Sequence, residues 1–271
     1  ATAYTDARRP ADAENAYQQA IRIRPGYWSA YYNLGVFYEM RGQYDKALEP
    51  LSLVVKLAPE YAEGHTTLGS LYYFMERFDE ALDEYSKSLA LRPTAFAYSN
   101  RGGMYFARGD YVHAREDFRR ALALESNDPL FWGNLADTEW QIPGAQDEAR
   151  NDYRKAISLS RERLGVNPND ADVLGRMAYY LARTANCTEA QTTIAKARSL
   201  APDRVALLYK SAKVSETCHD RESALRYLES AMQKGYSRHE IEQDPDLSQL
   251  RQSPAYAALR ARQAESKQNK P

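Results

Sequence analysis

The sequence has little cysteine and no long hydrophobic run. Its 271 residues include only two cysteines, Cys187 and Cys218, too few for a disulfide scaffold or for a metal site with four cysteine ligands. The longest apolar stretch runs from Leu51 to Ala58 and is broken by Lys56, whereas a membrane-spanning helix needs about 20 apolar residues. We therefore expect neither a disulfide-rich domain nor a membrane span.

An excess of one charge is also missing. The chain has 36 Lys and Arg residues against 37 Asp and Glu residues, a formal net charge of -1. Nucleic-acid binding requires a concentrated basic face, and the sequence shows none, so nucleic acid is not an expected partner. With 44% hydrophobic and 27% charged residues, the composition is typical of a folded, helix-rich chain.

Motifs for catalysis and cofactor binding are absent as well. The four histidines form no His-Glu-x-x-His pair, and there is no Gly-x-Ser-x-Gly elbow, glycine-rich phosphate loop or kinase catalytic loop. His65 stands 34 residues after Tyr31 and is interpreted as a packed aromatic substitute. Asp244 and Asp246 flank Pro245, where carboxylates more often cap a turn than bind a metal. We expect no enzyme activity, no catalytic residue, no metal site and no cofactor.

What the sequence does contain is a pair of amphipathic helical patterns that recurs every 34 residues. It is clearest from Trp28 to Tyr61, where a short turn at 41–43 joins the two patterns. The residues expected on the packing faces fall at helical spacing and are Tyr31, Leu34, Gly35, Tyr38, Ala47, Leu51 and Val54. Steps of 34 residues connect Pro25, Pro59 and Pro93, where the missing backbone donor ends a helix.

This period and these residue types resemble the tetratricopeptide repeat (TPR) family. The first helix carries an aromatic residue, Leu, Gly or Ala, and Tyr, and the second carries Ala, an aromatic residue and Ala. The resemblance covers nearly the whole chain. It implies an all-α fold, a right-handed TPR superhelix (α-solenoid) of antiparallel helix pairs with a C-terminal helical cap.

The pattern predicts a TPR array over 1–236. It consists of a partial repeat at 1–27, which begins inside a first helix, and of repeats at 28–61, 62–94, 95–128, 129–170, 171–204 and 205–236. The second helix of 129–170 is expected to be extended by about two turns. Residues 237–264 are expected to form capping helices, and 265–271 a disordered tail. The apolar residues expected to cover the last repeat are Ile241, Leu247, Leu250, Tyr256 and Leu259.

A closer resemblance covers roughly 127–260. The stretches YRKAISLSRERLGVNPNDADVLGRMAYYLAR and ALRYLESAMQKGYSRHEIEQDPDLSQLRQSPAYAAL are similar to the C-terminal TPR region of bacterial multidomain signalling proteins. In these, the repeats follow a Ser/Thr protein kinase, an adenylate cyclase or a winged-helix regulator. The resemblance implies a non-catalytic sensory or scaffolding region that binds a protein or peptide, with a kinase favoured as the upstream effector. A free-standing assembly factor and a small-ligand sensor are the alternatives.

In TPR proteins the first helices line a concave groove, and the corresponding positions can be followed along this chain. Amide side chains there suit an extended peptide backbone, and aromatic side chains would wall the middle of the groove. The predicted groove residues are Tyr32, Asn33, Tyr73, Phe74, Phe96, Asn100, Phe106, Asn134, Asp137, Trp140 and Tyr179. Gly133 and Gly175 are expected to leave room for a ligand. Tyr73, Phe74, Phe106 and Trp140 fit the groove and the core equally well.

The Lys/Asn clamp by which chaperone-binding TPRs hold a C-terminal carboxylate is not expected here. Its positions carry Tyr32 with Val36 and Thr66 with Ser70. The position of Asn33 turns basic in the later repeats, at Arg176 and Lys210.

Cys187 and Cys218 fall near the helix-to-helix turns of adjacent repeats. We interpret them as two independent small residues, with a disulfide between them as the alternative, because the sequence cannot supply the Cα separation below about 7 Å that a bridge needs. A bridge would indicate an oxidising compartment. For the location of the chain, the extracytoplasmic side of a membrane-anchored protein is favoured over the cytoplasm.

Overall fold

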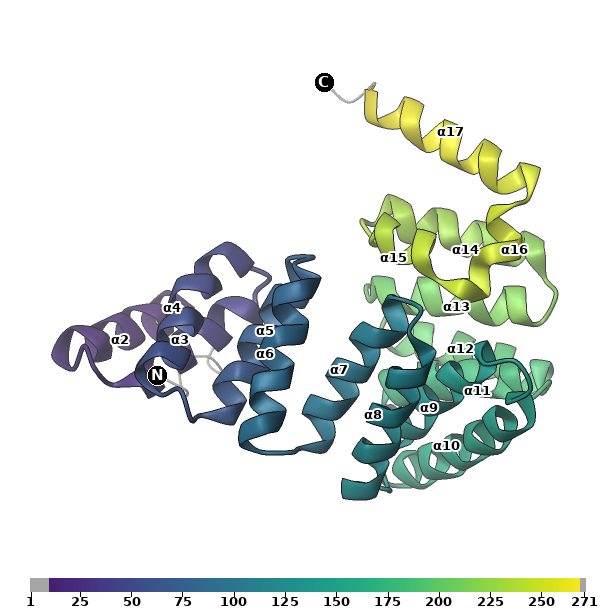
Figure 1. Ribbon diagram of the computed structural model, residues 1–271. Coiled ribbons are helices and arrows are strands. Elements are labelled where there is room, and N and C mark those ends of the chain that lie inside the picture. The colour runs from purple at the N-terminus through teal and green to yellow at the C-terminus, as the bar shows by residue number, and fades with distance from the viewer. Residues whose placement is uncertain (1–9, 269–271) are drawn as a thin grey trace. The chain divides into compact units, whose positions relative to one another are not determined.

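The computed structural model describes residues 10–268 and consists of helices joined by short turns (Figure 1). Within that range there is no strand, and no helix is long and apolar enough to cross a membrane. The predicted all-α architecture of paired helices is confirmed. Contacts divide the chain into two compact units, 1–125 and 126–271. The expected start inside a first helix concerns 1–9, outside the described residues.

The first unit is a row of helix pairs. Its helices are α2 (Pro10–Ile23), α3 (Trp28–Glu39), α4 (Tyr44–Leu57), α5 (Ala62–Phe74), α6 (Phe78–Leu91), α7 (Ala95–Ala107) and α8 (Tyr111–Leu124). α3 packs on α4, α5 on α6 and α7 on α8, while α4 touches α5 and α6 touches α7. Each helix is thus covered by its partner and by the next pair along the chain.

Small residues at fixed positions let the helices of a pair approach closely. A Cβ atom added to Gly35 of α3 would lie 2.5 Å from Cγ of Leu51 on α4. One added to Gly69 of α5 would lie 2.9 Å from the ring of Tyr85 on α6. Because the interior is close-packed, larger residues at these positions would push the helices apart.

The turn inside several pairs contains one residue with a left-handed backbone. In the first unit these residues are Gly42 with a φ of 68°, Glu76 with 60° and Gly109 with 75°. In the second unit Ala185 and His219 both have a φ of 62°. A residue with a Cβ atom is strained in this conformation by roughly 1–2 kcal/mol, so the packing of the flanking helices must hold these turns.

The second unit continues the helix pairs and ends in shorter helices. Its elements are α9 (Pro129–Gln141), α10 (Gln146–Val166), α11 (Ala171–Arg183), α12 (Cys187–Leu200), α13 (Val205–Thr217), α14 (Arg221–Gln233), α15 (Arg238–Gln243), η1 (Pro245–Leu247), α16 (Ser248–Arg251) and α17 (Pro254–Gln268). α10 has 21 residues, against 13 in α9 and 14 in α12. Within this unit α11 contacts both α10 and α13.

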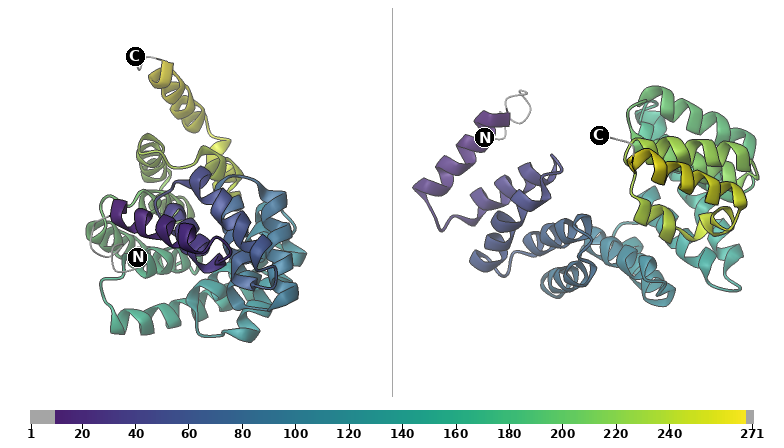
Figure 2. Two further views of the ribbon diagram at one scale, coloured as in Figure 1. Left: turned by 90° about the vertical axis from the view of Figure 1, so that its left-hand side faces the viewer. Right: turned by 90° about the horizontal axis from the view of Figure 1, so that it is seen from above.

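The last four elements cover the end of the final helix pair, and α17 packs on α14 (Figure 2). The five apolar residues predicted for this role are all buried, in one cluster with Ala224, Leu228 and Ala231 of α14. The hydroxyl of Ser237 caps α15 by accepting a hydrogen bond from the Glu240 amide.

The C-terminal tail differs from the expectation. Helix α17 continues to Gln268, although 265–271 were expected to be disordered. Glu265, Ser266, Lys267 and Gln268 include good helix formers and contain no proline, so a helix that begins at Pro254 is not stopped there. Residues 269–271 lie outside the described range.

The cap should contribute measurably to stability. Leu250 is fully buried against α14, so Leu250→Ala should lower the free energy of unfolding by roughly 2–5 kcal/mol. The matched control is Leu200→Ala in the same unit, because Leu200 is 39% exposed. Urea unfolding followed by helical circular dichroism measures both. Equal midpoints for the two variants would contradict a stabilising cap.

Candidate protein-interaction site

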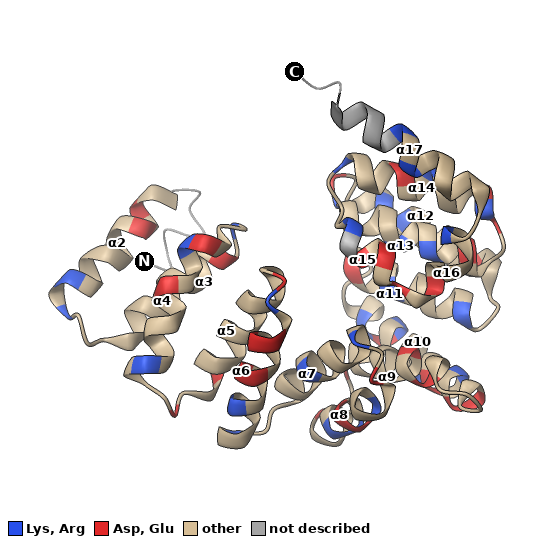
Figure 3. Ribbon diagram, turned by 45° about the horizontal axis from the view of Figure 1, so that its top comes forward, with Lys and Arg blue, Asp and Glu red and all other residues tan. Residues whose placement is uncertain are grey.

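A short acidic stretch of the chain, which enters the 3-10 helix η1, lies against the helices of the second unit. Asp244, Pro245 and Asp246 follow α15, and η1 contacts α13. The Asp244 carboxylate accepts a hydrogen bond of 2.9 Å from the Asp246 amide, so it caps its own turn as predicted. Figure 3 shows acidic and basic residues gathered around α11, α13 and α16.

The carboxylate of Asp246 is bound by side chains from α11 and α13. It accepts hydrogen bonds from Nη2 of Arg183 at 2.5 Å and from the Tyr179 hydroxyl at 2.6 Å. Nζ of Lys213 lies 2.9 Å from it. The side chains of Arg183 and Asp246 are each only 8% exposed. Charges removed from water to this extent are tolerated only when each is paired and hydrogen-bonded.

The Asp244 carboxylate is held by the same lysine. Nζ of Lys213 lies 3.0 Å from it, and the Tyr209 hydroxyl donates a hydrogen bond to it. Lys213 therefore bridges the two acids that flank Pro245. A single side chain of α13 thus holds both ends of the stretch from Asp244 to Asp246.

The pKa values of Asp246 and Asp137 depend on burial, which favours the neutral acid, and on nearby cations, which favour the ionised form. Burial by itself raises the pKa of Asp246, but Lys213 and Arg183 outweigh it and lower the pKa to about 2. Asp137 of α9 accepts a hydrogen bond of 2.5 Å from the Tyr153 hydroxyl. Burial raises the pKa of Asp137 to about 6, although the charge of Lys213 opposes the shift. Asp137 is thus poised to take up a proton close to neutral pH, whereas Asp246 stays ionised.

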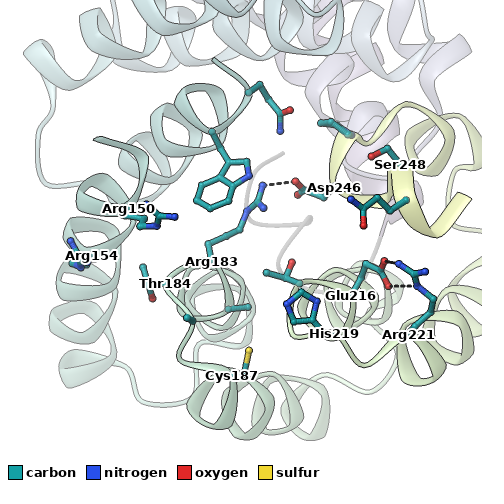
Figure 4. A pocket seen from close by; sticks show the side chains of 17 residues that line it. Arg150, Arg154, Arg183, Thr184, Cys187, Glu216, His219, Arg221, Asp246 and Ser248 are labelled. Carbon is teal, nitrogen blue, oxygen red and sulfur yellow. Dashed lines mark hydrogen bonds and ion pairs between the residues drawn. The ribbon is translucent and has the colours of Figure 1, made fainter. Parts of the chain in front are cut away.

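A pocket of about 890 Å³ opens beside Asp246. Its wall is formed by the last turns of α9, α11 and α13, the first turns of α10 and the stretch from Pro245 to Gln249. The guanidinium carbon of Arg183 lies 4.4 Å from the ring centroid of Trp140, within cation–π distance. In Figure 4, Arg183 reaches toward Asp246 at the centre of the pocket, and Arg150 and Arg154 lie across from Glu216 and Arg221.

The cations at the rim of this pocket are weakly held. Arg150 pairs with Asp147, whose side chain is 92% exposed, and Arg154 donates to the Asn151 amide oxygen. Exposed pairs of this kind contribute roughly 0–1 kcal/mol, so these guanidinium groups can exchange partners at little cost. The pocket wall carries four arginines against two carboxylates, Glu216 and Asp246. Its chemistry favours an anionic, partly apolar occupant.

Comparisons with known proteins agree with this arrangement of helices. Residues 1–62, 62–95 and 95–128 match models of the tetratricopeptide repeat. Residues 1–128 therefore consist of tetratricopeptide repeats. Human "Tetratricopeptide repeat protein 13" is 32% identical over 124 residues, which are 44% of this TPR chain and only 14% of that protein.

Solved structures share the TPR fold. The Cut9–Hcn1 hetero-tetramer of the APC/C superposes with a TM-score of 0.65 at 13% identity, over 89% of this chain and 46% of that one. A TPR protein from Parabacteroides merdae superposes with a TM-score of 0.61 at 19% identity, over 89% of this chain and 93% of that one. Identities this low speak for the fold alone. TPR folds present surfaces for protein interaction.

In the first unit of this TPR array, some of the predicted groove residues are engaged within the unit. The Asn33 amide donates to the Ser29 carbonyl at 2.9 Å, and the hydroxyls of Tyr32 and Thr67 lie 3.3 Å apart. The ring of Phe106 lies 5.4 Å from that of Tyr111. Asn100 is half-buried on α7.

Three predicted aromatic residues of the first unit lie at the surface. Tyr73 is 37% exposed, Phe74 49% and Phe96 57%. Phe74 also stacks on Tyr44 of α4, with ring centroids 5.2 Å apart. Tyr73 and Phe74 therefore lie at the surface rather than in the core, and their place in a groove stays a prediction.

In the second unit the predicted groove residues meet the charged stretch and the pocket. Tyr179 and Asp137 belong to the cluster around Asp246 and Tyr153, and Trp140 lines the pocket. Asn134 is half-buried on α9. Sequence reasoning placed Lys213 on a groove-facing position but missed Arg183 and the contact of Asp246 with α11 and α13. The only signal for them was the basic drift of the groove positions in the last repeats.

The expectation that Gly133 and Gly175 leave room is wrong. A Cβ atom on Gly133 would lie 2.1 Å from the Tyr180 hydroxyl, and one on Gly175 would lie 2.6 Å from Cδ2 of Leu207. These glycines admit a neighbouring side chain rather than a ligand. His65 is packed as predicted: its ring nitrogens lie 2.6 Å from the Glu84 carboxylate and 2.9 Å from the Pro59 carbonyl.

The interpretation of the cysteines as independent is corrected. Cys187 and Cys218 form a disulfide, with their Cα atoms 5.7 Å apart. Cys187 begins α12 and Cys218 follows α13, so each stands beside a turn with a left-handed residue, Ala185 or His219. Stacking of adjacent repeats brings these equivalent turns together, which no local pattern reveals. The bond ties together two turns at the edge of the pocket.

The disulfide predicts a specific mass and stability. The chain purified from an oxidising compartment should be lighter than its reduced form by two hydrogens, and Cys187→Ser should abolish that difference. Reduction should lower the free energy of unfolding by roughly 3–4 kcal/mol, because the bond closes a loop with a sequence separation of 31. Alkylation of both thiols without prior reduction would contradict the bond.

The raised pKa of Asp137 predicts a pH dependence. The folded state binds a proton with a pKa of about 6, whereas the ordinary value is 3.8, so protonation favours folding between these values. As the pH falls from 7 to 4, this group should add on the order of 2–3 kcal/mol to the free energy of unfolding.

Asp137→Asn should lack this gain, whereas Asp147→Asn, with its exposed side chain, should keep it. Urea unfolding at a series of pH values measures the difference. The same pH profile for wild type and Asp137→Asn would rule out the shift.

Proposed function

We propose that this TPR chain binds an extended, acidic segment of a partner protein at the pocket in its second unit. The observation that carries the proposal is the stretch from Asp244 to Asp246. It runs from the end of α15 into the short 3-10 helix η1, and α11 and α13 hold it through its carboxylates. A surface that binds one such segment from its own chain has the chemistry to bind another in the pocket alongside.

The pocket offers the groups that a peptide of this kind requires. Arg150 and Arg154 present guanidinium groups, which bind carboxylates through paired hydrogen bonds, whereas Arg221 is already paired with Glu216. Trp140 supplies an aromatic surface for an apolar side chain of the partner. Hydroxyl and amide side chains suited to a peptide backbone come from Gln141, Thr184, Ser248 and Gln249.

As its cellular role, the chain serves as the sensory or scaffolding region of a bacterial signalling protein, with a Ser/Thr kinase as the favoured effector. The resemblance over roughly 127–260 supports this role. The long helix α10 and the Asp244–Asp246 stretch, which carry that resemblance, both contribute to the pocket. The parts of the sequence that suggest signalling are therefore the parts that shape the site.

A selection of random displayed peptides against the intact chain tests the binding site. The enriched peptides should be acidic, and a synthetic copy should bind wild type at least about tenfold more tightly than Arg150→Glu/Arg154→Glu, since each tenfold corresponds to about 1.4 kcal/mol. Lys155→Glu is the matched control, because Lys155 is exposed on the same helix and lies outside the pocket. Peptides that bind the Arg150→Glu/Arg154→Glu variant as tightly as wild type would refute the site.

A further inference from the structure

The face of α11 and α13 that holds Asp244 and Asp246 is the inner surface of the second unit. It carries two more cations, one helical turn away from the bound acidic stretch. Arg176 precedes Tyr179 by three residues on α11, and Lys210 precedes Lys213 by three residues on α13. Residues three apart share a helix face, so this pair lies on the face that holds Asp244 and Asp246. The aliphatic part of Lys210 is close to α11, since a Cβ atom on Gly175 would lie 3.4 Å from Cδ of Lys210.

Neither cation has a hydrogen bond or an ion pair to any residue between 10 and 268 that the structure describes. The acids nearby are already engaged. Asp172 on α11 pairs with Arg204, and Asp137 on α9 accepts the hydrogen bond from Tyr153. Lys213 is shared by Asp244 and Asp246. Asp172 and Asp137 attract Lys210, but neither makes an ion pair with it, so among the described residues Arg176 and Lys210 lack a directly paired anion.

The surroundings make this arrangement unfavourable without an anion. Burial, together with the charges of Arg176 and Lys213, lowers the pKa of Lys210 to about 8 against the pull of Asp172 and Asp137. A carboxylate beside Lys210 would restore its ordinary affinity for a proton. Arg176 adds a planar guanidinium that can bind both oxygens of one carboxylate.

We infer that Arg176 and Lys210 form a second carboxylate subsite, which takes an internal Asp or Glu side chain of the partner segment. This inference rests on the proposed function and specifies the partner further. The neighbouring subsite shows which kind of group fits, because Asp244 and Asp246 are internal side chains rather than a chain terminus. Two acidic positions are then required of the partner, one for the arginines of the pocket and one for this pair.

Binding of an acetylated, amidated oligoglutamate peptide tests the subsite by titration calorimetry at low and high salt. Wild type should bind it with an affinity that falls as salt rises. Arg176→Ala and Lys210→Met should each weaken binding about five- to tenfold, whereas Arg150→Glu/Arg154→Glu should affect this peptide less. A peptide with a free C-terminus should bind no more tightly than the amidated one.

A second readout separates binding from structure. Because Lys210 makes no ion pair with the residues described from 10 to 268, Lys210→Met should leave the unfolding midpoint unchanged or raised, and the Lys210 amine should titrate at higher pH once oligoglutamate is bound. Equal binding of wild type and both variants overturns the subsite. So does a lowered midpoint of Lys210→Met, or binding of inorganic phosphate in place of oligoglutamate. Failure of the peptide selection alongside a positive result here would refute the pocket and leave this subsite standing.

Discussion

The second unit depends on two carboxylates that are brought out of water onto its inner helices. Asp246 is held by Arg183, Lys213 and Tyr179, and Asp244 shares Lys213. Removing one partner from such a buried group leaves the other charge unpaired, at a cost of roughly 3–5 kcal/mol. The ion pairs therefore fix where the segment between α15 and α16 lies. From this position Leu247 and Leu250 reach the apolar end of α14.

The bound acidic stretch separates two basic regions on the inner surface of this unit. On one side of the acidic stretch is a pocket with arginines at its rim and Trp140 in its wall. One helical turn away on the other side are Arg176 and Lys210. The chain's own segment satisfies the central cations, so the charge that remains for a partner is confined to the two flanks. This is why the proposed ligand is acidic, although the chain as a whole has a net charge of only -1.

Much of the fold could be predicted from the sequence, because the TPR period reflects local packing. Gly35 and Gly69 mark the close approach of two helices, and proline marks the end of a pair, so helix positions follow from spacing alone. The residues of the cap were also predictable, since Ile241 and Leu259 lie in helices whose starts carry clear capping signals.

The candidate site was predictable only in part. Trp140, Asp137 and Tyr179 could be placed on the inner surface by repeat position, but their partners could not. Arg183 and Asp246 are 63 residues apart in the sequence. They meet because the segment after α15 packs against α11, and the repeat period gives no sign of this contact. The disulfide has the same origin, since stacking of repeats alone sets the distance between Cys187 and Cys218. Gly133 and Gly175 were misread because a missing side chain looks the same whether a ligand or Tyr180 fills the space.

The most direct test of the proposed site is a double-mutant cycle between Arg183 and Asp246. The free energy of unfolding is determined by urea titration for wild type, Arg183→Met, Asp246→Asn and the double variant. If the buried pair holds the acidic stretch on the inner helices, each single change should destabilise, and the double variant should lose at least about 1 kcal/mol less than the sum of the two. Strictly additive losses would show that the two side chains do not interact, and would contradict the arrangement on which the proposed site depends.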